Sequence, residues 1–294
     1  DLQYSDFGGI LTEDNTFYFT SARTESKKKY GWNEQPYLDI YSAKYDPEEG
    51  KFKDIAQVSE LNSKLHDGPV SITADGQTMY FSSESFRSRK FTKNVAQRLK
   101  EGKVSLYRAK FDGKKWKNIE PVSFNSAEYM VSNPSVSADG KTLYFASRGH
   151  VGMGGSDLFV SRMDKNGNWG QAVNLGYPIN TQYDENSLMV SPTGEIAFFA
   201  SDREGGYGDL DIYYSELPES MSPTTTVYFD GIVYDQTTKF PLSGKFELID
   251  ISTGEQVVIS EADKITGQFM VSLPVNREYA LNVSYPGYLF FSKK

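Results

Sequence analysis

Short runs in which apolar and polar residues alternate dominate the first two thirds of the chain, and one run recurs four times. Its copies read LTEDNTFYFTS, ITADGQTMYFSS, VSADGKTLYFAS and VSPTGEIAFFAS, and they end at Ser21, Ser83, Ser147 and Ser201. In each copy a turn sequence, Asp-Gly in two of them, separates two apolar stretches, which is the pattern of a β-hairpin. The closing serines are about 60 residues apart, so the chain contains a repeated β unit.

A second strand pattern follows every hairpin. It reads DIYSAKYD, SLYRAKFD, DLFVSRMD and DIYYSEL in the successive copies, and in the first three a further segment ending near an asparagine comes after it. Each of these repeats is predicted to hold four short strands, which in the third copy are placed at 134–137, 142–147, 158–163 and 171–175. Tandem four-stranded units are typical of β-propeller blades, because a single blade cannot bury both of its faces.

The fourth copy supplies strands at 187–191, 196–201 and 210–217 only, after which the pattern stops. An unpaired strand edge invites aggregation, so another segment is expected to cover it. We predict that residues 1–3, or a segment upstream of them, pair with the last strand and fasten the first blade to the last.

The hairpin motif SADGKTLYFAS, followed by GGSDLF (154–159) or by GDLDIY (208–213), resembles the WD40-like propeller repeat of TolB and of multidomain OmpA-family envelope proteins. The resemblance extends roughly from Tyr4 to Leu217. It implies an all-β fold class, in which residues 1–218 form a β-propeller of four-stranded blades.

The pattern changes after LPESMSPTT, a segment rich in Pro, Ser and Thr, and residues 219–225 are predicted to be a linker. The motifs GIVYD, PLSG, GQF and YPGY beyond it resemble the carboxypeptidase-regulatory-like module. Residues 226–294 are accordingly expected to form a small transthyretin-like β-sandwich, whose strands alternate as a sandwich requires.

This domain order is similar to that of large OmpA-family proteins of the Gram-negative periplasm, some of which accompany type IX secretion and gliding. The resemblance implies a non-catalytic docking scaffold, periplasmic and associated with the outer membrane, whose partners are other envelope or secretion-system proteins. In such relatives a peptidoglycan-binding domain follows the sandwich. No such domain is recognised in this sequence, so peptidoglycan is expected as a partner only through a flanking domain absent here.

Composition narrows the function classes. The 294 residues carry a formal charge of −8, with 31 basic and 39 acidic side chains, which argues against a surface evolved to bind nucleic acid. No apolar run reaches the roughly 18 residues of a membrane-spanning helix, so no direct membrane span is expected. The 20 tyrosines and 19 phenylalanines suit strands, and the absence of cysteine excludes disulfides and thiolate metal sites.

Catalytic side chains are scarce in the sequence. Its two histidines, His66 and His150, stand without a recognisable partner, and there is no Gly-x-Ser-x-Gly motif. We predict that the chain is not an enzyme and holds no cofactor and no metal. A carbohydrate-binding or carbohydrate-cleaving propeller is the alternative, because carboxylates are plentiful enough for a glycosidase pair. Asp75 and Asp139 precede glycine directly, unlike the Asp box of propeller sialidases, so turns are expected there.

An arginine follows each closing serine, and a carboxylate precedes each hairpin. The arginines are Arg23, Arg87, Arg148 and Arg203, and the carboxylates are Asp6, Asp67, Glu128 and Asp184. At the mouth of a propeller they would form either a site for an anion or ion pairs that hold the blades together. We favour the structural role, because a feature repeated in every blade usually serves the blade. We expect Arg148 and Arg203 to pair with carboxylates.

Two loops that are not repeated are the better candidates for binding a partner. The second copy extends the loop after its hairpin to FRSRKFTKNVAQRLKEGK, and the first extends it to TESKKKYGWNEQP. Their basic residues are Arg87, Arg89, Lys90, Lys93, Arg98, Lys100 and Lys103 in the second copy and Lys27, Lys28 and Lys29 in the first. In an acidic chain this local positive excess predicts a docking surface for an acidic partner. A solvated or disordered loop is the alternative.

Overall fold

The computed structural model describes residues 4–23, 36–89, 92–94, 99–191, 193–289 and 291–293. These residues form an all-β structure, as predicted, and their helical elements are two short 3-10 helices, η1 (Ser85–Ser88) and η2 (Glu219–Met221). The chain divides into two compact units, residues 1–223 and 224–294. Within the described ranges, no helix is long and apolar enough to cross a membrane.

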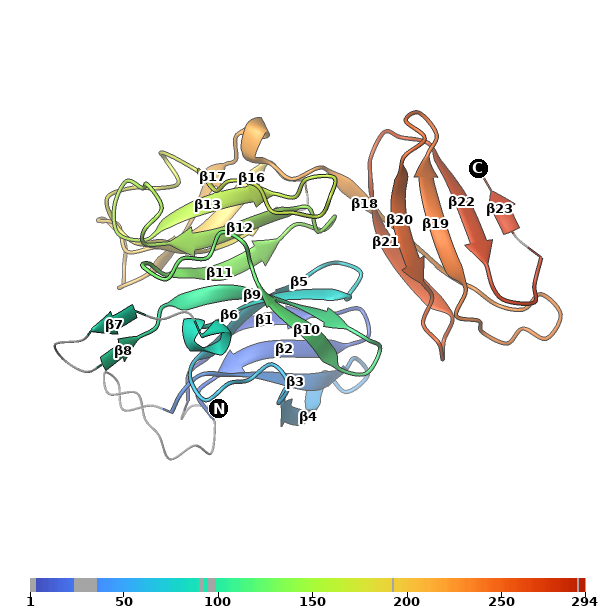
Figure 1. Ribbon diagram of the computed structural model, residues 1–294, viewed down its shortest axis with the longest axis horizontal. Coiled ribbons are helices and arrows are strands. Elements are labelled where there is room, and N and C mark those ends of the chain that lie inside the picture. Colours follow the sequence, from blue (N-terminus) through green and yellow to red (C-terminus); the bar gives the residue numbers. More distant parts are fainter. Residues whose placement is uncertain are drawn as a thin grey trace. The chain divides into compact units, whose positions relative to one another are not determined.

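The described part of the first unit is built from four successive antiparallel meanders, the blades, which follow one another as a stack in Figure 1. Blade 1 consists of β1 (Asp6–Leu11), β2 (Thr16–Ser21), β3 (Asp39–Asp46) and β4 (Lys51–Gln57). Blade 2 consists of β5 (Asp67–Ile72), β6 (Thr78–Glu84), β9 (Val104–Phe111) and β10 (Trp116–Pro121). Blade 3 consists of β11 (Val131–Val136), β12 (Thr142–Ser147), β13 (Asp157–Arg162) and β14 (Val173–Asn174).

Blade 4 has three described strands, as the sequence predicts: β15 (Glu185–Val190), β16 (Ile196–Ser201) and β17 (Asp211–Glu216). A separate hairpin of β7 (Thr92–Asn94) and β8 (Leu99–Glu101) is inserted in blade 2 between β6 and β9. The repeated four-stranded unit inferred from the sequence is therefore present in the first three copies.

Local chemistry explains the turns within the hairpins. Thr73 Oγ1 donates a hydrogen bond to Asp75 over 2.6 Å. Gly76 follows with a φ of +66°, a conformation that glycine adopts without a steric cost. The same arrangement recurs at Asp139 and Gly140, where φ is +67°. These aspartates shape turns, as predicted.

The first strand of every blade carries a β-bulge with one residue in the left-handed conformation. The φ angle is +64° at Gly8, +98° at Gly68, +51° at Asn133 and +54° at Ser187, and the register against the second strand shifts at each place. Bulges bend a strand, and these first strands contact one another from blade to blade. The approach is close: a Cβ on Gly68 would lie 2.3 Å from Thr20 Oγ1 of the preceding blade.

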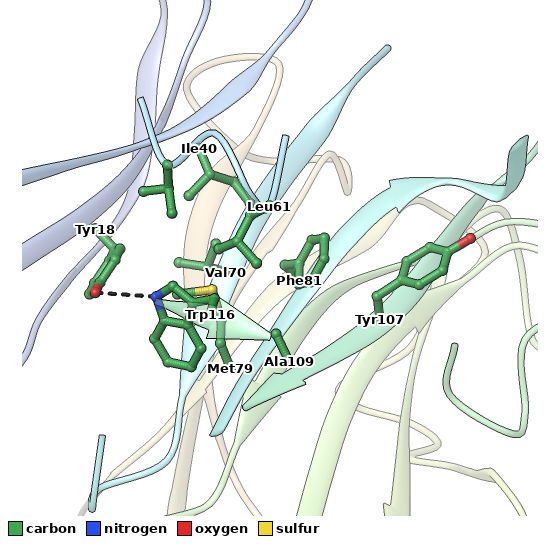
Figure 2. Close-up of a cluster of buried hydrophobic side chains, with 10 residues drawn as sticks. Tyr18, Ile40, Leu61, Val70, Met79, Phe81, Tyr107, Ala109 and Trp116 are labelled. Atoms are coloured by element: carbon green, nitrogen blue, oxygen red, sulfur yellow. Dashed lines mark hydrogen bonds between the residues drawn. The ribbon is translucent and has the colours of Figure 1, made fainter. Parts of the chain in front are cut away.

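Apolar side chains from facing blades fill each junction. Figure 2 shows the junction of blades 1 and 2, where Tyr18 meets Trp116 in a buried cluster that also contains Phe81. Trp116 Nε1 donates to Tyr18 Oη over 3.3 Å, and the two rings meet edge to face. The rings of Tyr80 of blade 2 and Trp169 of blade 3 also meet edge to face, with their centres 5.7 Å apart. Edge-to-face contacts stabilise aromatic pairs beyond the burial of their area, so this repeated contact fixes consecutive blades.

The two ends of the stack are open within the described residues. Blades 1 and 4 lie at opposite ends of the stack (Figure 1), and no described strand pairs with the outer edge of β17. Residues 1–3, which were predicted to close the ring, lie outside the described part of the chain.

Part of the predicted linker, residues 219–225, is fixed on blade 3. Tyr144 Oη donates to the carbonyl oxygen of Met221 over 2.6 Å, and Arg162 Nη2 donates to that of Ser220 over 2.9 Å. The Pro/Ser-rich composition predicted a linker, whereas these contacts use backbone carbonyl groups that composition does not reveal.

The second unit contains two antiparallel sheets around one core. In the first sheet β18 (Thr226–Ile232) pairs with β21 (Gln268–Pro274). The second sheet has the order β20 (Gln256–Glu261), β19 (Lys245–Asp250), β22 (Tyr279–Ser284) and β23 (Phe291–Lys293). Phe246 and Leu248 of one sheet and Val271 and Leu273 of the other form the buried cluster. The finer likeness to a transthyretin-like sandwich stays a prediction.

Candidate functional site

In blades 1, 2 and 4 an arginine side chain contacts a buried serine at the end of the second strand. This serine is the last residue of the strand in blades 1 and 4 and the last but one in blade 2. The Nε–H groups donate to the serine Oγ atoms: Arg23 to Ser21 over 2.9 Å, Arg87 to Ser83 over 3.1 Å and Arg203 to Ser201 over 3.0 Å. Because the serine belongs to a regular strand, this hydrogen bond sets the position of the whole guanidinium group.

Each of these guanidinium groups lies over two aromatic rings, one from the second strand and one from the third. The distances from the guanidinium carbon to the ring centres are 5.0 and 5.8 Å for Phe19 and Tyr41, 5.5 and 5.8 Å for Phe81 and Tyr107, and 5.0 and 4.8 Å for Phe199 and Tyr213. A cation within about 6 Å of a ring centre is attracted by the ring quadrupole. The aromatic positions of the repeat therefore form a seat for the arginine.

The same guanidinium groups meet a carboxylate of their own blade. The pairs are Arg23 with Asp6 at 2.6 Å, Arg87 with Asp67 at 3.1 Å and Arg203 with Glu185 at 3.2 Å. Each acid begins the first strand and stands directly opposite the serine in the register, which is why the three groups converge. Burial raises the pKa of Asp6, but hydrogen bonds from Ser21 and Arg23 outweigh it and hold that pKa below its ordinary value. We call this arrangement of serine, arginine, acid and two rings the arginine clasp.

Two of the clasps also hold the loop that arrives from the preceding blade. Arg87 Nη2 donates to the carbonyl oxygen of Leu61, and Arg203 Nη2 donates to that of Ile179 over 2.7 Å. In blades 2 and 4 the guanidinium group thus connects one blade to the next, while a structural rather than ligand-binding role of the repeated arginines stays a prediction.

The ion pairs expected at Arg203 and Arg148 are both present, but they differ in their surroundings. Glu185, which the sequence analysis did not single out, is fully buried beneath Arg203, whose side chain is 18% exposed. Arg148 instead reaches Asp184 of the next blade at 2.5 Å, and these side chains are 52% and 31% exposed. Glu128, the fourth carboxylate of the predicted mouth, meets no arginine in the contacts of the described residues.

Blade 3 lacks the arginine clasp. Val131 stands opposite Ser147, where the other blades have the acid, and His150 takes the place of the arginine. Its Nδ1 lies 2.9 Å from Ser147 Oγ, and its ring centre lies 5.8 Å from that of Phe145 and 5.1 Å from that of Phe159. Burial lowers the pKa of His150 below its ordinary value, so the ring is neutral at neutral pH. In blade 3 a neutral histidine and a valine therefore stand where the other blades have a charged arginine and an acid.

A hollow of about 430 Å³ lies beside this histidine, between the loop that leaves blade 2 and the outer part of blade 3. Its walls include Phe124, Tyr129, His150, Phe159, Gln171 and Asn174. The ring of Tyr129 lies over Gly149, where a Cβ would come within 2.0 Å of it. None of the residues that line this hollow is an acid, a lysine or an arginine.

The basic residues predicted to bind a partner are only partly covered by the structure. Five of them lie outside the described residues, namely Lys27, Lys28, Lys29, Lys90 and Arg98. In the β7–β8 hairpin, Lys93 and Lys100 are register partners. Arg89 is exposed, and the backbone N–H of Lys103 donates to Ser85 Oγ. Arg87, the remaining member, is held in the clasp of blade 2. A partner-binding role for this loop stays a prediction.

Comparison with known proteins gives similarity to solved β-propeller structures. No protein-family model matches the chain, and no curated protein matches it. TolB from Acinetobacter baumannii is similar with a TM-score of 0.45 and 14% identity over 94% of this chain, which spans 56% of that one. A luciferin-regenerating enzyme is similar with a TM-score of 0.44 and 10% identity, over 75% of this chain and 64% of the other. A puromycin hydrolase gives 0.42 and 12%, over 95% and 43%. These scores place the chain in no family.

The prediction that the chain is not an enzyme is wrong as an inference from this fold. It rested on a propeller architecture with few recognisable catalytic residues, and the similar structures include enzymes such as the puromycin hydrolase, a gluconolactonase and an endo-arabinanase. Function depends on the site and not on the fold, so a fold expectation does not decide whether a chain is a catalyst.

Proposed function

We propose that the first unit is a protein-docking scaffold and that its partner binds the open face of blade 4. The supporting observation is a contrast in exposure at one repeated position of the third strand. Ile40, Leu106 and Leu158 hold that position in blades 1 to 3 and are fully buried at 0% exposure, whereas Ile212 of blade 4 is 82% exposed. Blade 4 therefore presents to solvent a position that the other blades bury against a neighbour.

Neighbouring side chains extend this apolar surface across all three strands of the blade. Met189 of β15 pairs with Phe198 of β16, and Phe198 pairs with Tyr214 of β17. All three are exposed, and the rings of Phe198 and Tyr214 lie 6.4 Å apart. We call Met189, Phe198, Ile212 and Tyr214 the blade 4 face. Fully burying one such side chain contributes about 1.5–3 kcal/mol, and contiguous exposed apolar patches mark interaction sites.

The resemblance of the repeat motifs supports an envelope protein as the partner. It favours a periplasmic location associated with the outer membrane and, among such proteins, an accessory role in type IX secretion or gliding. The basic loops of blades 1 and 2 would supply a second contact that steers an acidic partner surface. The second unit would serve as a spacer or a further contact.

A matched pair of variants tests this proposal. Ile212→Asp places a charge on the blade 4 face, and Ile265→Asp places one on an equally exposed isoleucine of the second unit, at 81% exposure. Both variants should keep the far-UV circular dichroism and the Tm of the natural chain. Capture of the partner from envelope extracts should fall at least tenfold for Ile212→Asp and stay unchanged for Ile265→Asp. Equal capture by the two variants would contradict the proposal.

Sedimentation at several concentrations separates a foreign partner from a second copy of the chain. If the natural chain forms a dimer that Ile212→Asp abolishes, the blade 4 face binds itself, and the proposal of an envelope partner fails.

A further inference from the structure

The hollow beside His150 lies at the junction of blades 2 and 3 and includes no residue of the blade 4 face. The proposed docking function does not require it. In the clasps of blades 2 and 4 the guanidinium group extends from the serine to the loop carbonyl of Leu61 or Ile179 and fills the space between them. An imidazole bonded to the serine through Nδ1 ends before that loop. The hollow beside His150 occupies the corresponding space in blade 3.

The hydrogen bonds around Ser147 determine which nitrogen of His150 carries the proton. Ser147 Oγ donates to the carbonyl oxygen of Met130 over 3.0 Å, so its lone pairs accept the bond from His150 Nδ1 at 2.9 Å. The proton of the neutral ring is therefore on Nδ1, and Nε2 is an acceptor. The Nδ1–H group donates to the serine as the arginine Nε–H group does in the other blades. His150 is one of the residues that line the hollow, and its neutral ring brings no charge to it.

The rest of the lining also favours a neutral ligand with hydroxyl groups and apolar faces. Phe124 and Tyr129 supply aromatic surface, and Gln171 carries an amide group, which both donates and accepts hydrogen bonds. The amide of Asn174 is held within the blade, because its Oδ1 accepts from the Gly176 N–H and from Asn180 Nδ2. A volume of about 430 Å³ falls in the usual range of small-molecule sites. Sugar rings combine hydroxyl groups with C–H faces that stack on aromatic rings. We propose that the hollow of blade 3 binds a neutral carbohydrate unit, with His150 Nε2 accepting a hydrogen bond from a sugar hydroxyl.

A cationic ligand is the competing class, because the equivalent rings of the other blades hold a guanidinium group. Each of those three guanidinium groups has a carboxylate, whereas blade 3 has Val131 at that place. A cation bound at His150 would lose hydration without a counter-charge in the lining, and desolvating an unpaired charge is unfavourable. The exchange of acid for valine and of arginine for histidine therefore points to a neutral ligand.

The two histidines of the chain make the test direct, because each gives separate imidazole ¹⁵N signals. His66 Nδ1 accepts a hydrogen bond from the Leu38 N–H at 3.2 Å, so its proton is on Nε2, opposite to His150. Cellobiose is titrated as the neutral probe, and N-acetyl-arginine amide as the cationic one, each up to about 50 mM so that a millimolar Kd can be measured. Cellobiose should shift His150 Nε2 saturably and leave His66 unchanged.

Three variants check the assignment to the hollow. His150→Arg puts into blade 3 the side chain that fills this space in blades 2 and 4, and it should abolish the saturable binding of cellobiose, which is followed in all variants by the backbone amide signals of the lining residues. Tyr129→Ala should weaken it at least tenfold, and it keeps the proposal testable if His150→Arg fails to fold. Tyr207→Ala removes a fully exposed tyrosine of blade 4 and is the control, with no change expected. Absence of saturation by cellobiose, equal affinity in all variants, or binding of the arginine derivative in preference to the sugar would overturn the proposal.

Discussion

The arginine clasp of blade 4 predicts a large difference between two arginines that look alike in the sequence. In Arg203→Ala the protein loses the hydrogen bonds of the guanidinium group to Ser201, to the carbonyl oxygens of Pro178 and Ile179, and to Glu185. It also loses the contacts with two aromatic rings at 5.0 and 4.8 Å. Glu185 is left buried without its counter-charge.

The expected cost of Arg203→Ala follows from what remains around that acid. Breaking a buried pair by removing one partner costs about 3–5 kcal/mol. Glu185 keeps hydrogen bonds from the Thr181 backbone N–H (2.9 Å), from Thr181 Oγ1 (2.6 Å) and from Ser201 Oγ (2.8 Å), so we expect the lower end, about 3 kcal/mol. Arg148→Ala removes an ion pair that is half exposed, and such pairs contribute about 0–1 kcal/mol.

Equilibrium unfolding in urea, followed by tryptophan fluorescence, measures the difference. All three tryptophans, Trp32, Trp116 and Trp169, belong to residues 1–223, so the signal reports on the first unit. Arg203→Lys keeps the charge without the planar fork and should recover only part of the loss. A loss below about 1 kcal/mol for Arg203→Ala, or equal losses for Arg203→Ala and Arg148→Ala, would refute the reasoning.

Three further outcomes are expected. Gly152→Ala would place a Cβ 1.7 Å from Asp157 Oδ2 and should destabilise the first unit by about 1–3 kcal/mol in the same urea assay; an unchanged midpoint would exclude this contact. Asn180→Ala removes the side chain that bonds both the N–H and the carbonyl oxygen of Leu158 at 2.8 Å and should cost about 2–3 kcal/mol, read as a lower Tm. Burial lowers the pKa of His150 in the folded state, so protonation of this ring favours the unfolded state. The contribution of His150 to the free energy of unfolding is fully present above the unfolded pKa of about 6.5 and is lost as the pH falls below it. The loss between pH 7 and 5 should be smaller in His150→Phe, and equal slopes would argue against this titration.

The repeated pattern of the sequence was sufficient to predict the blades. Apolar alternation, the Asp-Gly turns and the closing serines are local features, and each is found in the corresponding strand or turn of the structure. The three strands of the fourth copy were predicted for the same reason.

The sequence pattern hides the exception in blade 3, because an arginine follows the closing serine in all four copies. Arg148 follows Ser147 directly, while the group that occupies the clasp position, His150, comes two residues later. The signal that would have found it is the loss of the acid at Val131 together with intact aromatic positions. The acid of blade 4 was missed similarly: Asp184 and Glu185 are adjacent, and only the register shows that Glu185 faces the serine.

Exposure of the blade 4 face was beyond sequence reasoning for a different reason. Ile212 repeats an apolar position that is buried in three other blades, so the pattern alone predicts a core residue. Whether a neighbouring surface covers it depends on packing that no local pattern encodes.

Photo-crosslinking from position 212 in the intact envelope tests the docking proposal most directly. A photoreactive amino acid replaces Ile212 in one variant of the natural full-length protein and Ile265 in another, and the adducts are identified by mass spectrometry. The proposal predicts one dominant envelope-protein adduct from position 212 that is absent from position 265. Adducts that are the same from both positions, or an adduct from position 212 only with a second copy of this chain, would contradict it.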